Sequence, residues 1–293
     1  MNTSIKVLDG GMGTSLSDMG LDLSGSLWSA RVLVDNPEAI KTVHQNHARA
    51  GADILTSSSY QASLRGFLQA GYSRDDYFRA LEVSTVLARD VAEEIGREQG
   101  RKIFVAASIG PFGATLADGS EYRGNYGVSR EFLIDFHAER LEHLSVHEFD
   151  YLAFETVPSA IELEAINQLL TEDFRSIRAW VSCSARSESE ISDGTLFTDA
   201  MTLLTAKNII ARGVNCTPPH FIASLIESTD GPFVVYPNAG TWDALNRQWL
   251  EVDESSFHID TLQAWLEKDV QILGGCCGLD SGYIKAVAQA VNR

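Results

Sequence analysis

The sequence predicts an α/β fold, a single (β/α)8 barrel of the TIM type that spans residues 1–293 as one domain. Eight short runs of apolar, β-branched or aromatic residues alternate along the chain with segments of helical periodicity, and no Pro/Gly/Ser-rich linker or short internal repeat divides them. Eight strand–helix units in a chain of 293 residues are typical of this barrel. The strands are expected at residues 5–8, 53–56, 103–107, 151–154, 179–182, 213–215, 233–236 and 270–273.

Residues at the ends of the expected helices support this alternation. Asn36 followed by Pro37 indicates a helix start, and Gly51 indicates the end of the same helix. Ser73 is expected to cap a long helix that follows the second strand, and Ser281 is expected to open the last helix of the chain.

A doubly wound open sheet is the alternative fold for alternating strands and helices. Such a sheet usually carries a glycine-rich phosphate loop directly after its first strand. Residues 9–14 are rich in glycine but lack the G-x-G-x-x-G spacing, and no acidic residue obviously closes a second strand. The barrel is therefore favoured.

The charge balance restricts the class of partner. The chain has 23 Lys and Arg against 40 Asp and Glu, a formal net charge of −17. Nucleic acids and anionic membranes are bound through basic surfaces, so both are unlikely partners and small-molecule substrates are expected. The amino terminus lacks the pattern of a signal peptide, and no apolar run approaches the roughly 20 residues that cross a bilayer, so a cytoplasmic protein is expected.

Three of the four cysteines fall where a barrel places its functional groups. Cys216 follows the sixth expected strand, and Cys276 and Cys277 follow the eighth, between glycines. Because these strands lie two positions apart around a closed barrel, their ends can meet at its mouth. Three thiolates with one open position suit a catalytic zinc ion, although the spacing alone leaves open that the cysteines are small buried apolar residues. Cys183, inside the fifth strand, is expected in the core.

Two carboxylates are also expected at strand ends. Asp9 ends the first strand and Glu155 ends the fourth. Each can bind a cationic group, act as an acid or base, or cap the following turn. His44 and His47 lack the spacing of a zinc-binding H-E-x-x-H motif and are expected at the surface or in helix packing.

Ten short segments in the same order along nearly the whole chain carry a resemblance to a known family. They are residues 8–14, 27–30, 50–54, 59–63, 108–111, 116–122, 154–156, 213–216, 236–238 and 274–278. Together they resemble the homocysteine S-methyltransferase family. The resemblance implies a barrel that places homocysteine on one zinc ion per chain, and it implies that Cys216, Cys276 and Cys277 are the zinc ligands. Zinc would keep the homocysteine sulfur as a thiolate, the form that attacks a methyl group.

The resemblance also implies where the amino-acid substrate lies. Asp9 and Glu155 match acidic positions near the ammonium group of homocysteine. The turn that contains Gly10, Gly11 and Met12 matches the place where main-chain amides meet its carboxylate. One departure from the family pattern is visible: residues 278–280 read Gly-Leu-Asp, where the branch that uses S-methylmethionine often has Arg-Thr followed by proline.

The methyl donor of this family is a sulfonium or a quaternary ammonium compound. Such a cation favours aromatic side chains, and Trp28 and Tyr60 are the candidates because both fall on or near loops that follow strands. The segment 116–122 and the compact length resemble the branch that uses S-methylmethionine, with S-adenosylmethionine as an alternative donor, and a monomer is expected. A betaine-type donor, the homocysteine-binding half of a cobalamin-dependent methionine synthase and a non-catalytic zinc- or thiol-binding barrel remain the alternatives.

Overall fold

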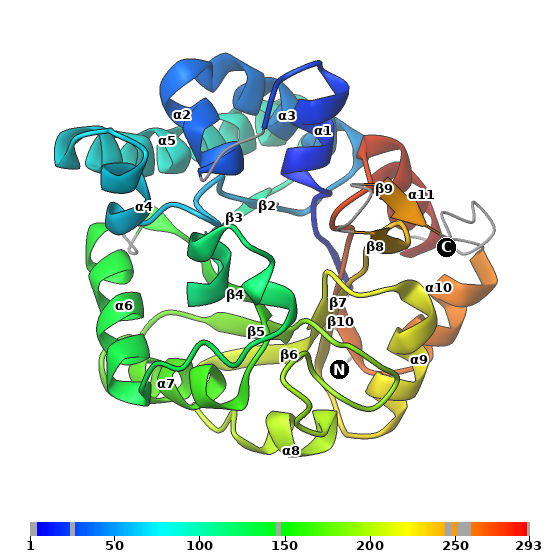
Figure 1. Cartoon of the computed structure of the whole chain (residues 1–293). Helices are drawn as coiled ribbons and strands as arrows, with labels where there is room; N and C mark the ends of the chain where they lie inside the picture. Colours follow the sequence, from blue (N-terminus) through cyan, green and yellow to red (C-terminus); the bar gives the residue numbers. More distant parts are fainter. Residues whose placement is uncertain (1–4, 24–26, 145–147, 244–247, 251–258, 292–293) are drawn as a thin grey trace.

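The computed structural model describes residues 5–23, 27–144, 148–243, 248–250 and 259–291, and it confirms the predicted barrel. Eight parallel strands form one sheet in the order β1-β10-β7-β6-β5-β4-β3-β2. A parallel bridge between Leu8 and Ile54 joins the two ends of that order, and the Asp53 amide donates to the carbonyl of Val7 at 2.7 Å. Main-chain hydrogen bonds therefore close the barrel, and the helices form a ring around it (Figure 1).

All eight expected strands are present; β7 and β10 have the expected bounds and the other six have shifted ends. They are β1 (Lys6–Val7), β2 (Ile54–Thr56), β3 (Phe104–Ile109), β4 (Tyr151–Val157), β5 (Ala179–Cys183), β6 (Ile209–Asn215), β7 (Phe233–Tyr236) and β10 (Val270–Leu273). The largest shift is in β6, which begins before the expected residue 213. Arg212 lies within β6, so the strand does not read as one apolar run in the sequence. Its guanidinium donates to the carbonyl of Met201 at 2.8 Å.

The helices follow the strands as expected. They are α1 (Met12–Asp18), α2 (Val32–Asp35), α3 (Pro37–Ala50), α4 (Leu64–Gln69), α5 (Arg74–Gln99), α6 (Arg130–His143), α7 (Ala160–Glu172), α8 (Phe197–Thr202), α9 (Pro219–Glu227), α10 (Ile259–Leu266) and α11 (Ser281–Val291), with short 3-10 helices η1 (Trp28–Arg31), η2 (Phe112–Leu116) and η3 (Ser120–Tyr122). The described residues contain no helix with both the length and the apolar character of a membrane span.

The expected helix ends are confirmed: α3 begins at Pro37, with Asn36 at its cap position, and α11 begins at Ser281. Ser73 and Asp76 form a reciprocal capping box at the start of α5, and Gly51 ends α3 at a φ of 115°, in the left-handed region that favours glycine. Asn36 occupies the cap position of α3, but its side chain makes no capping hydrogen bond. Pro37 supplies the start of that helix because it needs no hydrogen-bond acceptor for its nitrogen.

One element was not expected, an antiparallel pair of strands between β7 and α10. β8 (Thr241–Asp243) pairs with β9 (Gln248–Leu250), and each strand has three residues. Strands of this length are too short for alternating hydrophobicity to reveal them in the sequence.

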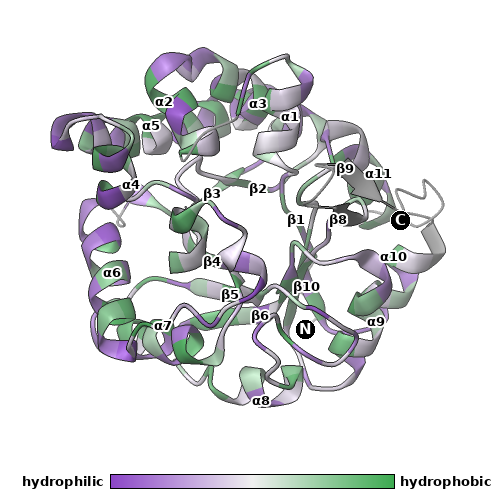
Figure 2. Cartoon of the chain, viewed as in Figure 1, coloured by the Kyte–Doolittle hydropathy of each residue, from purple (hydrophilic) through white to green (hydrophobic). Residues whose placement is uncertain are grey.

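Apolar side chains form one layer inside the barrel and another between strands and helices. Figure 2 shows hydrophobic residues concentrated on the strands and on inner helix faces, with hydrophilic residues outside. Within the barrel the rings of Phe104, Tyr151 and Trp180 stand in sequence, with centroids 5.7 Å and 5.9 Å apart. These rings fill the interior, so a ligand is expected at the carboxyl ends of the strands.

Two further expectations concern buried residues. Cys183 is fully buried in β5, as predicted. His44 and His47 are fully buried on α3, so they belong to helix packing and the surface expectation is wrong. Burial lowers the pKa of His44 to about 3 and that of His47 to about 4, so both rings are neutral at physiological pH.

Candidate metal and substrate site

Three cysteine sulfurs meet at the carboxyl ends of β6 and β10. The Sγ atoms of Cys216 and Cys277 lie 3.7 Å apart, and those of Cys216, Cys276 and Cys277 all lie within 4.8 Å of one another. Cys183 lies in the strand interior and is not part of this group. These are the three residues that the sequence placed at strand ends, and their sulfurs can hold a metal ion.

The segment that follows β7 fixes the backbone on both sides of the sulfur cluster. The Cys216 amide donates to the carbonyl of Tyr236 at 3.1 Å, and the Cys276 amide donates to that of Pro237 at 2.7 Å. Cys216 has a φ of 51°, a left-handed conformation that is uncommon for a residue with a side chain and that often marks functional positions. Because β7 lies between β6 and β10, it sets the distance between the two cysteine segments.

The glycine-rich turn after β1 packs against the loop that carries the cysteine pair. A Cβ atom on Gly11 would lie 2.5 Å from the carbonyl oxygen of Cys276, and one on Gly10 would lie 2.6 Å from that of Leu279. The Gly11 amide donates to the Leu279 carbonyl at 2.9 Å. Glycine is thus required here for close approach of two main chains, and Met12 follows as the first residue of α1.

The departure at residues 278–280 has a clear structural role. The Gly278 amide donates to Thr14 Oγ1 on α1 at 2.7 Å, and Gly278 has a φ of 82°. The carboxylate of Asp280 accepts from the Gly282 amide at 2.9 Å and so caps the start of α11. This local sequence closes the loop onto the neighbouring helices and leaves the cysteine pair in place.

The three thiols differ in acidity because they share hydrogen bonds. The hydrogen bonds from Cys276 and Cys277 lower the pKa of Cys216 well below its ordinary value, although burial acts in the opposite direction. The same contacts with Cys216 raise the pKa values of Cys276 and Cys277. One thiolate is therefore favoured, whereas three thiolates at this spacing need a bound cation to offset their mutual repulsion.

Asp9 and Glu155 are both buried near the sulfur cluster, but different contacts hold them. The carboxylate of Asp9 accepts from the amide of Thr56 at 2.7 Å and from its hydroxyl at 3.1 Å. Glu155 accepts a short hydrogen bond from the hydroxyl of Ser108. Burial raises the pKa of Asp9 well above its usual range and that of Glu155 to about 7. A cation beside either group would favour its ionised form.

A hydrogen-bond network that the sequence did not reveal fixes the end of β4. Thr156 has a φ of 61°, and its amide donates to the side-chain oxygen of Asn215 at 2.7 Å. The Asn215 amide group donates in turn to the Thr156 hydroxyl at 2.8 Å, and Ser182 Oγ donates to Asn215 Oδ1 at 2.8 Å. Asn215 immediately precedes Cys216, so the network connects the backbone beside Glu155 to the backbone beside a cysteine.

The two aromatic candidates lie on different loops. Trp28 begins η1, and its indole ring covers Gly13 so closely that a Cβ there would lie 2.3 Å from two ring atoms. Tyr60 lies against Gly110, and Arg140 donates to the carbonyls of both residues, at 2.9 Å and 2.6 Å. Burial raises the pKa of Tyr60 well above its usual value, and Glu121, Cys216 and Glu155 raise it further. Tyr60 therefore lies near Cys216.

Sequence reasoning missed three polar residues around the cysteines. The hydroxyl of Tyr122 lies 3.1 Å from Cys216 Sγ, and Glu121 precedes it on η3. Asn238 also interacts with Cys216, and its side-chain oxygen is buried without a hydrogen-bond partner among the described residues. Their segments, 116–122 and 236–238, carried the family resemblance, and this was the only signal for these residues in the sequence.

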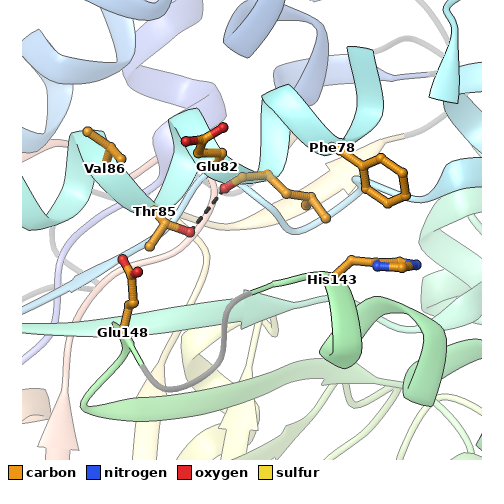
Figure 3. Close-up of a pocket in the computed structure, with 7 residues that line it drawn as sticks. Phe78, Glu82, Thr85, Val86, His143 and Glu148 are labelled. Atoms are coloured by element: carbon orange, nitrogen blue, oxygen red, sulfur yellow. Dashed lines mark hydrogen bonds between the residues drawn. The ribbon is translucent and has the colours of Figure 1, made fainter. Parts of the chain in front are cut away.

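A separate cavity of about 300 Å³ lies between α5 and the end of α6 (Figure 3). Its lining includes Phe78, Glu82, Thr85, His143 and Glu148, and the Thr85 hydroxyl donates to the carbonyl of Leu81 at 3.0 Å. The rings of Phe78 and His143 meet edge to face, with centroids 4.6 Å apart and planes inclined by 66°. These residues belong to helix packing outside the barrel, so this cavity is not the candidate site.

Comparison with known proteins connects this geometry to one family. The family model described as homocysteine S-methyltransferase matches residues 6–291. The chain is 41% identical to Homocysteine S-methyltransferase YbgG of Bacillus subtilis (strain 168), over 96% of this chain and 93% of that protein. It is 37% identical to Homocysteine S-methyltransferase 2 of Arabidopsis thaliana, over 98% of this chain and 93% of that protein.

A solved structure shows the same similarity in three dimensions. The homocysteine methyltransferase MmuM from Escherichia coli, in a crystal structure described as the metallated form, matches with a TM-score of 0.87 and 37% identity. The match covers 98% of this chain and 96% of that one. The similarity therefore includes the whole barrel and the strand ends that carry the cysteines.

The elevated pKa of Glu155 predicts how stability depends on pH. Its pKa is about 7 in the folded chain, above the ordinary value of 4.5 for a glutamate side chain. Between these values the folded state holds a proton that the unfolded state has released, so stability falls as the pH rises through this window. Urea unfolding at pH 5 and pH 8 should show that Glu155→Gln, which cannot ionise, loses less stability than the parent over this range. Glu139→Gln, on an exposed part of α6, is the control and should follow the parent. Equal pH dependence for the parent and Glu155→Gln would show that Glu155 ionises normally.

Proposed function

We propose, because the chain belongs to the homocysteine S-methyltransferase family, that it transfers a methyl group from an onium donor to the thiol of homocysteine and forms methionine. The observation that carries this proposal is the meeting of three cysteine sulfurs at the carboxyl ends of two barrel strands. Buried carboxyl groups and an aromatic ring surround these sulfurs, and these are the groups that bind cationic amino acids and onium methyl donors.

The sulfur geometry supports zinc as the bound metal, one ion per chain. In a tetrahedral site with zinc–sulfur bonds of about 2.3 Å, two sulfurs lie about 3.8 Å apart. The distance of 3.7 Å between Cys216 and Cys277 fits this value. Zinc held by three thiolates would supply the Lewis acidity that keeps a substrate thiol deprotonated at neutral pH. One chain contributes all three sulfurs, so the proposed site is complete in a monomer.

Homocysteine is proposed to bind with its ammonium group near Glu155 and Asp9. Burial raises the pKa values of both carboxyl groups because it disfavours their ionised forms. An ammonium group beside these carboxyl groups would stabilise the ionised forms and would be bound by them. The carboxylate of homocysteine would lie toward the turn of Gly10, Gly11 and Met12, where α1 begins. The amino end of a helix favours negative charge, which supports this orientation.

Methyl transfer then requires alignment more than acid–base catalysis. The homocysteine sulfur forms a bond to the donor methyl carbon while the bond from that carbon to the donor's own sulfur breaks, and the electron pair stays on the leaving sulfur. The leaving thioether is neutral, so the protein need not protonate it. The role of the chain is to hold the two sulfurs and the methyl carbon in line and to exclude water.

S-Methylmethionine is the proposed donor, with S-adenosylmethionine as an alternative of the same sulfonium class. Tyr60 and Trp28 are proposed to face its positive charge, because aromatic rings attract onium groups. Arg140 supports this role of Tyr60, since its guanidinium is buried and bonded to the carbonyls of Ser59, Tyr60 and Gly110. The loop that carries Tyr60 is thus held in one position before the donor arrives.

Metal analysis tests the proposed zinc site. Zinc-replete protein should contain one zinc ion per chain, and Cys216→Ala should lose both the metal and methyl transfer because two thiolates hold zinc less tightly than three. Cys183→Ala removes the same side chain from the core and should retain the metal. Elemental analysis by mass spectrometry measures both. A full complement of zinc with full activity in Cys216→Ala would contradict the assignment.

The donor assignment is tested by turnover of homocysteine with S-methylmethionine. In Trp28→Leu, the loss of a cation–π contact of about 1–2 kcal/mol predicts a roughly five- to thirtyfold fall in kcat/KM for the donor, with homocysteine affinity retained. Phe132→Leu removes another partly exposed ring, on α6, and should leave the kinetics unchanged. If the parent uses betaine and not S-methylmethionine, the assignment of the donor is wrong, but the assignment of homocysteine as the methyl acceptor stands. If homocysteine binds and no donor is turned over, a thiol-binding role is favoured.

A further inference from the structure

Glu121 places a third carboxyl group near the sulfur cluster, separate from Asp9 and Glu155. Its Oε2 atom is buried and has no hydrogen-bond partner among the described residues. The nearby cation, Arg123, is engaged elsewhere: its guanidinium lies 3.5 Å from the carboxylate of Asp118 and donates to Ser120 Oγ at 3.2 Å. The protein therefore provides a carboxylate and leaves one of its oxygens without a protein partner.

The backbone around Glu121 is held firmly, so this placement is not that of a loose loop. Ser184 Oγ, on the segment after β5, donates to the Glu121 carbonyl at 2.9 Å. Asp118 accepts from the Ser120 amide at 3.0 Å, and the Gly124 amide donates to the Ser120 carbonyl at 2.9 Å. A Cβ on Gly113 would lie 2.8 Å from the Glu121 amide nitrogen, so η2 and η3 are packed closely.

The carboxyl group of Glu121 lies near the sulfurs and Tyr60. The hydroxyl of the adjacent Tyr122 lies 3.1 Å from Cys216 Sγ. The negative charge of Glu121 raises the pKa values of Tyr60 and Cys277, as expected for buried groups that lie near one another. Glu155 enters from β4 and is bonded to Ser108. Two independent carboxyl groups, from β4 and from the loop after β3, therefore border one sulfur cluster.

A cation beside Glu121 would favour its ionised form. Burial raises the pKa of Glu121 to about 7, and the nearby Cys216 and Asp118 raise it as well, so the ionised form is costly in the free protein. The proposed reaction brings two cations to the site, the ammonium of homocysteine and the onium group of the donor. Glu155 and Asp9 are already assigned to the first, which leaves Glu121 for the second.

We propose that Glu121 is the specificity-determining residue for the methyl donor and supplies the counter-charge to its onium group. This inference rests on the proposed methyl transfer and adds a charge-based selection to it. The donor is a cation before transfer and a neutral thioether after it, so Glu121 attracts the substrate and not the product. Because positive charge leaves the donor as the methyl group moves to the thiolate, Glu121 stabilises the bound donor more than the transition state. Its loss should raise the donor KM and should not lower kcat.

Equilibrium binding of a charged and an uncharged ligand tests this role directly. S-Methylmethionine and methionine differ by one methyl group and one positive charge, and both can be titrated into zinc-replete protein without homocysteine. Glu121→Gln keeps the shape and removes the charge, so affinity for S-methylmethionine should fall at least about tenfold while affinity for methionine changes less than about twofold. Glu190→Gln removes the same charge from the loop after β5, where Glu190 pairs with Arg186 at 2.8 Å, and should change neither.

The ratio of the two affinities separates charge recognition from structural damage. A partly unfolded variant would lose binding of both ligands equally, so only a changed ratio supports the proposal, and Glu121→Asp, which keeps the charge, should preserve most of the parent ratio. An unchanged ratio in Glu121→Gln, or no binding of S-methylmethionine by the parent, would overturn it. If the parent binds S-methylmethionine in a Glu121-dependent manner but transfers no methyl group to homocysteine, the proposed function fails and the role of Glu121 stands.

Discussion

The site depends on the distance between the ends of β6 and β10. Cys216 and the cysteine pair are far apart in sequence, and β7 lies between their strands and holds both through main-chain hydrogen bonds to Tyr236 and Pro237. The resulting sulfur spacing of 3.7 Å suits a tetrahedral metal site, and the shared hydrogen bonds of the three thiols favour one thiolate at a time. A cation that binds all three sulfurs would satisfy this arrangement, and the left-handed backbone at Cys216 is consistent with strain kept for function.

The charges around the sulfurs fit the two cationic groups of the proposed reaction. Glu155 and Glu121 both have pKa values raised to about 7 by burial, and they come from different strand ends. Neither makes an ion pair among the described residues, so each can respond to a cationic ligand. The free protein is less stable with these groups ionised, and ligand cations would offset that cost. Function and stability are therefore opposed at these two positions, as is common in active sites.

The sequence predicted the site where residues with metal-binding side chains directly follow predicted strands. Alternating strands and helices predicted the barrel, and strand ends predicted that Cys216 would meet the cysteine pair. It could not reveal Asn215, because an asparagine gains its role only from neighbours on β4 and β5. The close approach of Gly11 to the Cys276 main chain is a long-range contact that no local pattern encodes. The sequence showed Glu121 and Tyr122 only as members of a family motif. The direction of their side chains could not be predicted, because it depends on how η2 and η3 pack.

The central claim is that the three sulfurs hold a zinc ion with one position open to the thiol of homocysteine. X-ray absorption at the zinc edge measures it most directly, because it counts the sulfur atoms around the metal. The claim predicts three sulfur ligands in zinc-replete protein and four after homocysteine is added, with no such change when methionine is added instead. Three sulfurs before and after saturation with homocysteine would contradict it, and the cysteines would then hold a metal that does not bind the substrate.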